Sequence, residues 1–147
     1  MRQRHPTIAV LALLALAAAL TAGCATIQPG ADPVLVNAER SLAVATDSID
    51  ALFKVDYQYG PAIDMKVPGW KGAVNELRLR APSILNAANA ATKAYRAGLT
   101  LYRADPTQIT QTQLNALAND LGQKIVAAVE AGQQAAKVAA TVPGGVL

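Results

Sequence analysis

The sequence is poor in the residue types that carry most enzyme chemistry. Its 147 residues include one histidine, His5, and one cysteine, Cys24, and aromatic residues make up only 4%. A single cysteine allows no disulfide within the chain. After residue 24 there is no histidine or thiol for a nucleophilic centre, a zinc site or a histidine-ligated haem. We therefore expect no enzyme activity.

Metal and phosphate sites are also not expected. Carboxylate-bridged di-iron bundles need inward Glu residues together with Glu-x-x-His, and the sequence has no match. It contains no glycine-rich phosphate loop. Asp47 and Asp50 form the closest acidic constellation, but they lie opposite the apolar residues of their predicted helix, which indicates a solvated surface. We expect no metal and no dissociable cofactor.

The first 23 residues read as an export signal. Residues 1–6 form a short cationic head, and residues 7–20 are an apolar run that ends beside small residues. The run is shorter than the roughly 20 apolar residues that a membrane-spanning helix needs. We expect residues 1–23 to be a cleaved signal peptide. An ordinary leader with an incidental cysteine and an uncleaved anchor are the competing interpretations.

The segment Leu20-Thr21-Ala22-Gly23-Cys24 resembles the lipobox of bacterial lipoproteins. Small residues precede the cysteine, whose thiol accepts a diacylglycerol in that family. Thr21 stands where Leu is usual, and Leu20 lies one place earlier. The resemblance implies cleavage before Cys24 and lipidation of Cys24, which would carry a diacylglycerol and an N-acyl chain such as palmitate. Stable anchoring needs more than one such chain.

The same resemblance implies a location. Lipoproteins that stay in the inner membrane typically carry Asp after the cysteine, whereas this chain has Ala25. We expect a lipid-anchored protein of the cell envelope, on the periplasmic face of the outer membrane if the source has two membranes. The membrane is therefore the first expected partner.

The charge of the chain belongs partly to the leader. Removal of Arg2 and Arg4 leaves 11 basic against 10 acidic residues, a net charge of +1. A chain so balanced has no general attraction for nucleic acid. Lys71, Arg78 and Arg80 are accordingly interpreted as a solvated or ion-paired helix face.

The rest of the chain predicts helices. Residues 24–33 form a short tether that spans at most roughly 30 Å, and Asp32-Pro33 is a helix start. Apolar residues then repeat every three or four positions (Leu35, Ala38, Leu42, Ala45, Ile49 and Leu52). Gly60-Pro61 is predicted to end this helix, with a loop to Gly69.

Two further helices follow. The second is predicted from Trp70 to Asp105-Pro106, and Pro82 lies inside its apolar pattern without shifting the phase. We prefer one helix kinked at Pro82 over two separate helices. The third begins at Thr110, which can form a capping box with Gln113, and ends at Pro143-Gly144-Gly145.

These elements predict an all-α fold, an antiparallel three-helix bundle over residues 34–141. Residues 142–147 would form a frayed tail. The mature part resembles, loosely, short uncharacterised helical proteins of bacteria and prophages, at Gly30-Ala31-Asp32-Pro33 and Asn37-Ala38-Glu39-Arg40. That resemblance implies no role.

Two groups of residues are candidates for interaction. Tyr57, Tyr59, Met65 and Trp70 gather around the predicted loop between the first two helices, which projects from the membrane in this topology. They either dock a partner or cap the end of the bundle. Lys93, Arg96 and Arg103 lie where the second helix returns toward the membrane, and either contact anionic head groups or are simply solvated.

Two classes of function remain. One is a non-catalytic envelope lipoprotein with a structural or protein-interaction role, whose partners are an envelope protein or further copies of the chain. The alternative is a helical module that binds a small apolar ligand between its helices on the membrane surface. Tight packing of the alanine-rich seams would favour the first, and a continuous internal cavity would favour the second.

Overall fold

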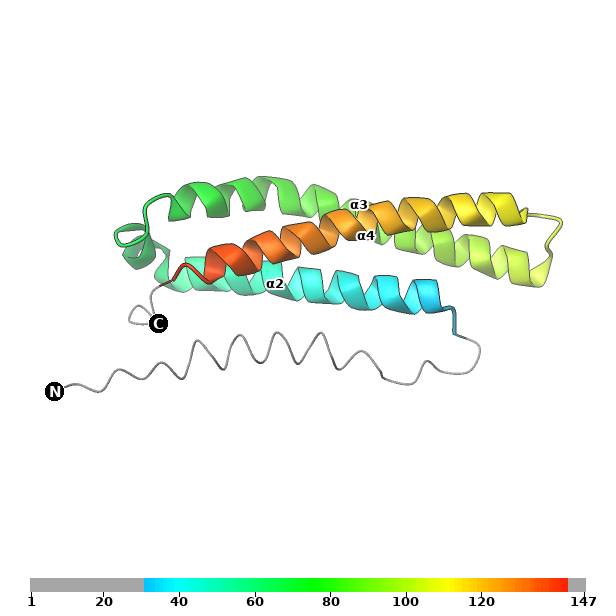
Figure 1. Ribbon diagram of the computed structural model, residues 1–147, viewed down its shortest axis with the longest axis horizontal. Helices are drawn as coiled ribbons and strands as arrows, with labels where there is room; N and C mark the ends of the chain where they lie inside the picture. The colour runs from blue at the N-terminus through cyan, green and yellow to red at the C-terminus, as the bar shows by residue number, and fades with distance from the viewer. Residues whose placement is uncertain (1–30, 143–147) are drawn as a thin grey trace.

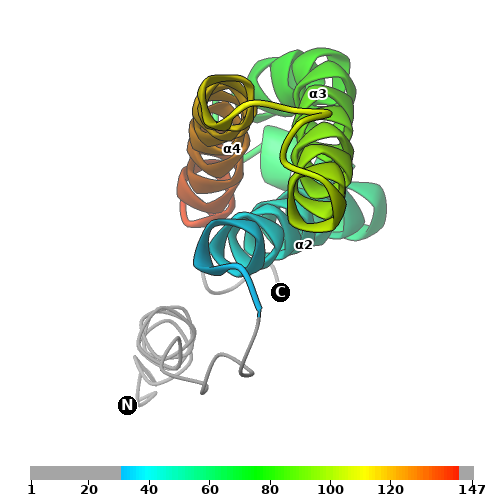
Figure 2. The same ribbon diagram turned by 90° about the vertical axis from the view of Figure 1, so that its right-hand side faces the viewer.

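The computed structural model describes residues 31–142, which form three long helices packed side by side (Figure 1). They are α2 (Pro33–Asp64), α3 (Trp70–Ala104) and α4 (Gln111–Ala139). α2 and α4 run in one direction and α3 in the other, and the end-on view places them at the corners of a triangle (Figure 2). The predicted all-α, antiparallel three-helix bundle is confirmed.

Side-chain caps begin two of the helices at the predicted residues. Asp32 precedes α2, and its Oδ1 accepts a hydrogen bond of 3.0 Å from the backbone N–H of Leu35. Thr110 precedes α4 and forms the predicted capping box: its Oγ1 accepts from Gln113 N, and Gln113 Oε1 accepts from Thr110 N. These caps satisfy backbone donors that have no partner within the helix.

The predicted end of the first helix at Gly60-Pro61 is wrong, because α2 continues to Asp64. Pro61 is exposed and costs the helix only one backbone hydrogen bond. Continuation in turn brings Ile63 into the core, where its side chain is 0% exposed. Burial of this side chain outweighs the local helix-breaking preference, and the connection to α3 shrinks to residues 65–69.

The second helix is continuous, as the preferred interpretation required. α3 runs through Pro82 without interruption, and Pro82 lies on the exposed side of the helix. The carbonyl that loses its partner to the proline ring therefore faces water, which can hydrogen-bond it.

The predicted end of α3 at Asp105-Pro106 is also confirmed. Asp105 follows the last residue of α3, and its Oδ1 accepts hydrogen bonds from the backbone N and the Oγ1 of Thr107, at 3.0 and 2.7 Å. These hydrogen bonds lower the pKa of the Asp105 carboxyl. They hold the short turn that leads into α4.

The core follows the predicted apolar seams and is uneven in side-chain size. Its largest fully buried side chains are Ile49, Leu52, Ile63, Val74 and Leu121. Small residues dominate the middle of the bundle, where Ala45, Ala88 and Ala128 pack with Leu42. Ala131 and Gly132 of α4 are buried as well.

Gly132 marks the tightest approach between helices. A Cβ atom at this position would lie 2.8 Å from the Cα of Ala45 on α2 and 3.1 Å from its Cβ. Both neighbours are fixed parts of α2 rather than a flexible side-chain end. The two helices can therefore meet at this distance only because neither residue carries a large side chain.

We expect Gly132→Ala to destabilise the fold by about 1–3 kcal/mol, because the added methyl forces α2 and α4 apart. Gly72→Ala is the matched control: a Cβ at this position meets nothing within 4 Å. This substitution should leave the fold unchanged or stabilise it by up to about 1 kcal/mol, because alanine lowers the conformational entropy of the unfolded chain. Urea denaturation followed by circular dichroism measures both, and equal effects of the two substitutions would refute the close contact.

Candidate functional site

The predicted acylation site lies outside the described residues. Cys24 and residues 25–30 of the predicted tether belong to the first 30 residues, and Pro143-Gly144-Gly145 to the last five. The lipidation of Cys24 thus stays a prediction. The candidate interaction residues all lie within residues 31–142.

The four residues of the predicted docking tip have different environments. Tyr57 is 90% and Met65 83% exposed, and Tyr59 is 36% exposed. Trp70 is only 2% exposed and belongs to the core. Trp70 therefore caps the end of the bundle, as one interpretation required, while Tyr57 and Met65 leave apolar surface in water.

A single carboxylate organises this end of the bundle. Trp70 Nε1 donates a hydrogen bond of 2.8 Å to Asp56 Oδ1, and Arg78 Nη2 donates one of 2.9 Å to Asp56 Oδ2. The Asp56 side chain is 18% exposed, so the ion pair with Arg78 is partly shielded from water. Asp56 thus ties α2 to two residues of α3 that lie about two turns apart.

Neighbouring residues extend this network. The Arg78 guanidinium lies 5.3 Å from the centre of the Phe53 ring, within the range of a cation–π contact. Asp64 Oδ1 accepts from the backbone N of Lys71 at 3.2 Å and so caps the start of α3. Gly69, at the N-cap position, has φ 86°, which favours glycine. The conformation of the connection is therefore fixed, and Met65 lies exposed at its start.

Sequence reasoning missed Asp56. It lies beside the apolar seam rather than in it, and the interpretation of Arg78 as part of a basic face named no partner for it. The available signal was a Trp indole at the start of a helix, because a buried indole N–H needs an acceptor. Arg78 and Arg80 are both ion-paired in the structure, to Asp56 and Glu76 respectively.

We expect Asp56→Ala to lower the free energy of unfolding by about 2–3 kcal/mol. The substitution removes the acceptor of two hydrogen bonds, one of them to a buried indole. Asp47→Ala, an exposed position on the same helix, should change stability by less than about 0.5 kcal/mol. Chemical denaturation monitored by Trp70 fluorescence measures both. Similar losses in the two variants would contradict the role given to Asp56.

At the opposite end, a second carboxylate joins the start of α2 to α3. The Tyr95 hydroxyl lies 3.3 Å from both carboxylate oxygens of Asp32 and donates to them. Asp32 also caps α2, so it fixes the point at which the chain enters the bundle. Burial raises the pKa of the Tyr95 hydroxyl, and the negative charge of Asp32 raises it further.

The three candidate head-group residues lie on the last three turns of α3. Their spacing of three and seven residues places Lys93, Arg96 and Arg103 along one side of that helix. All three are exposed, and Arg96 pairs with Glu39 of α2. The structure therefore brings them to one side, with part of the charge of Arg96 compensated by Glu39.

The raised pKa of Tyr95 predicts a loss of stability at high pH. An unfolded Tyr loses its proton near pH 10, whereas the folded protein still holds the Tyr95 proton there. The unfolded state then binds fewer protons than the folded state, so the free energy of unfolding falls as pH rises above about 10.

Urea denaturation between pH 8 and pH 11 measures this slope. We expect Tyr95→Phe to fall less steeply than the wild type, because its side chain does not titrate. Tyr57→Phe removes an exposed hydroxyl and should keep the wild-type slope. If the wild type and Tyr95→Phe lose stability in parallel, Tyr95 does not contribute to the pH dependence.

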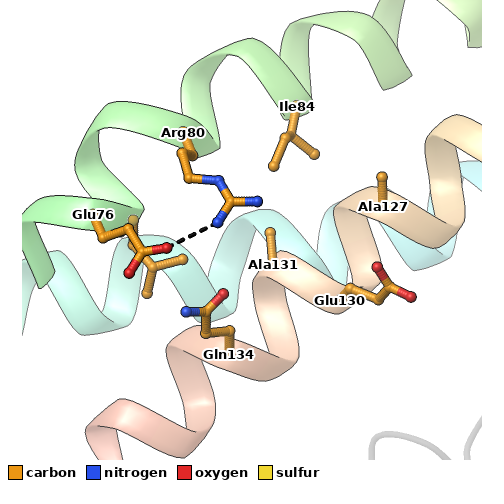
Figure 3. Close-up of a pocket in the computed structure, with 8 residues that line it drawn as sticks. Glu76, Arg80, Ile84, Ala127, Glu130, Ala131 and Gln134 are labelled. Carbon is orange, nitrogen blue, oxygen red and sulfur yellow. Dashed lines mark hydrogen bonds and ion pairs between the residues drawn. The ribbon is translucent and has the colours of Figure 1, made fainter. Parts of the chain in front are cut away.

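A groove lies between α3 and α4 (Figure 3). It measures about 160 Å³, and apolar side chains such as Leu77, Ile84 and Ala131 line part of it. Its rim is polar. On α3, Arg80 Nη1 donates a hydrogen bond of 2.8 Å to Glu76 Oε1, and on α4 the rim is formed by Glu130 and Gln134. The groove is small and bordered by charged groups, which suits a small apolar ligand poorly.

Two kinds of feature are absent from residues 31–142. No cluster of three or more His, Cys, Asp or Glu side chains in this part of the chain is arranged to hold a metal ion. Among α2, α3 and α4, no helix has the length and apolar character required to cross a membrane.

Comparison with known proteins gives no relative: no protein-family model, curated protein or solved structure matches this chain. The function must therefore be argued from the chain itself.

Proposed function

We propose that this protein is a cell-envelope lipoprotein, anchored through acyl chains on Cys24, whose helical bundle has a non-catalytic structural or protein-interaction role. The observation that carries the proposal is the segment Leu20-Thr21-Ala22-Gly23-Cys24 after a cationic head and an apolar run. The outer membrane, facing the periplasm, is the favoured location because Ala25 follows the cysteine.

The arrangement of the bundle is compatible with this anchor. Asp32, at the entrance of the bundle, lies eight residues after Cys24, so the domain would stay within roughly 30 Å of the bilayer. α2 then carries the chain about 45–50 Å away from that end. Exposed Tyr57 and Met65 would stand at the far end, accessible to an envelope protein.

The base of the bundle would face the membrane. Lys93 and Arg103 are exposed and belong to the last part of α3, and this helix returns toward the start of α2 (Figure 1). They are the residues of this end best placed to contact anionic head groups, at about 1 kcal/mol for each basic residue near the surface. Arg96 would contribute less because it pairs with Glu39.

The packing favours an interaction role over the binding of a small apolar ligand. The near-contact of Gly132 with Ala45 leaves no space between α2 and α4 at the middle of the bundle. The groove between α3 and α4 lies at the surface and has charged side chains on its rim. Both features suit a small apolar ligand poorly.

Cys24→Ser tests the anchor. We expect the wild type to be found in the membrane fraction with an acylated Cys24 at its N-terminus, as mass spectrometry would detect. Cys24→Ser should lose both the acyl mass and the membrane fractionation, because serine offers no thiol to the diacylglycerol transfer.

Ala25→Ser is the control, since it changes the neighbouring residue and leaves the thiol. Ala25→Asp should move the protein from the outer to the inner membrane fraction if the source has two membranes. An unmodified, uncleaved N-terminus in the wild type would overturn the proposal, as would unchanged fractionation of Cys24→Ser.

A further inference from the structure

One side of α2 is uncharged over most of its length. Val34, Asn37, Ser41, Val44, Ser48 and Ala51 each precede a core position by one residue and therefore form one stripe along the helix. Residues on the other flank of α2, including Glu39, Phe53 and Asp56, contact α3. The uncharged stripe thus lies on the side turned away from α3.

α4 carries a matching stripe. Asn115, Gly122, Val126, Val129, Gln133 and Ala136 each follow a core position by one residue. The opposite flank of α4, with Ala127, Glu130 and Gln134, borders the groove toward α3. Figure 2 shows α2 and α4 side by side. Since the two helices run in the same direction and each stripe lies on the flank away from α3, the two stripes share one side of the bundle, the α2–α4 face.

The absence of charge from this face is selective. All 11 basic and 10 acidic residues that follow Cys24 lie between Asp32 and Lys137, within the described part of the chain, and none is in either stripe. Apolar side chains are nevertheless exposed there: Val34 is 45%, Val44 42% and Val126 57% exposed. A solvated helix surface normally carries charged residues, and the lack of charge on this face is a property it shares with the buried centres of protein interfaces.

We propose that the α2–α4 face is the surface through which two copies of this chain associate. A two-fold contact places each residue of the face against the same face of its partner, so the surface must be complementary to itself. A face without charge meets this requirement, because no like charges are brought together.

The polar groups of the face are also self-complementary. Asn37 and Gln133 carry amides, and Ser41 carries a hydroxyl; each of these groups both donates and accepts hydrogen bonds. They can therefore pair with a second copy without leaving a buried donor or acceptor unsatisfied. A nucleic acid or an anionic membrane would instead require basic residues, which the face lacks.

The size of the face suits a weak dimer. The shorter stripe, on α2, limits the side-by-side length to about 26 Å, and two adjacent helices present a width of about 20 Å. Each copy would bury about 500 Å², or about 1,000 Å² in total, which is the lower limit for a biological interface and typical of weak association.

The direction of the helices suits a pair on one membrane. A two-fold axis parallel to the bundle places the start of α2 at the same end in both copies, so both tethers could reach one bilayer. This parallel arrangement rests on the proposed lipid anchor, whereas the pairing itself does not.

Sedimentation equilibrium of the full chain in density-matched detergent tests the proposal. We expect the wild type to sediment with the protein mass of two chains. Val44→Glu with Val126→Glu places charges in the face and should weaken dimerisation at least tenfold, giving one chain at the same concentration. Leu79→Glu with Leu101→Glu is the matched control: both leucines are exposed on α3, at 82% and 46%, and this variant should remain a dimer.

A second variant protects the test against misfolding. Asn37→Asp with Gln133→Glu adds two charges with almost no change in shape, and it should also yield one chain, with helical circular dichroism equal to that of the wild type. The proposal would be overturned if the wild type sedimented with the mass of one chain at concentrations up to 100 µM. It would also be overturned if either face variant were folded and kept the mass of two chains.

The outcome separates this inference from the proposed anchor. Cys24→Ser chains should still form the pair, since the face lies in the bundle. A wild type that is acylated but monomeric would refute the dimer and leave the anchor standing. A wild type that is dimeric but not acylated would refute the anchor and leave the dimer standing.

Discussion

The contact between Gly132 of α4 and Ala45 of α2 sets the spacing of the bundle. Because neither residue has a large side chain, α2 and α4 approach closely at mid-length, and Ala88 and Ala128 fill the same layer with little volume. Larger side chains, including Leu52, Ile63 and Trp70, lie together near the α2–α3 connection. The bundle is thus narrow in the middle and held by bulkier apolar clusters on either side.

Two carboxylates add polar contacts between helices to a core made largely of small side chains. Asp32 joins the start of α2 to Tyr95, and Asp56 joins the later part of α2 to Trp70 and Arg78. Each acts between helices that would otherwise be held near their ends mainly by apolar contacts. Hydrogen bonds to partly shielded carboxylates are directional, so these two residues also fix how the helices are aligned along one another.

The surface is divided into charged and uncharged regions. Charged side chains lie on the first and last parts of α3 and on the outer sides of α2 and α4, where they form ion pairs such as Arg96 with Glu39 and Arg80 with Glu76. The α2–α4 face has none, and the end of the bundle near the α2–α3 connection exposes Tyr57 of α2 and Met65. Within residues 31–142, the proposed contacts would therefore be made by the uncharged α2–α4 face and by the exposed Tyr57 and Met65.

The sequence alone determined the number of helices, most of their boundaries and the identity of the core. The three-four spacing of apolar residues and the caps at Asp32 and Thr110 are local signals, and the structure follows them. The continuity of α3 through Pro82 was also readable, because the apolar phase does not change across the proline.

Tertiary structure decided what local signals could not. Gly60-Pro61 is a helix breaker by itself, but the burial of Ile63 carries α2 beyond it. The partners of Asp56 are 14 and 22 residues away, and those of Gly132 are on another helix, so no periodic pattern reveals them. The uncharged face became visible only once α2 and α4 were placed side by side. Contacts between distant residues arise from how the helices pack, and the sequence encodes that packing only collectively.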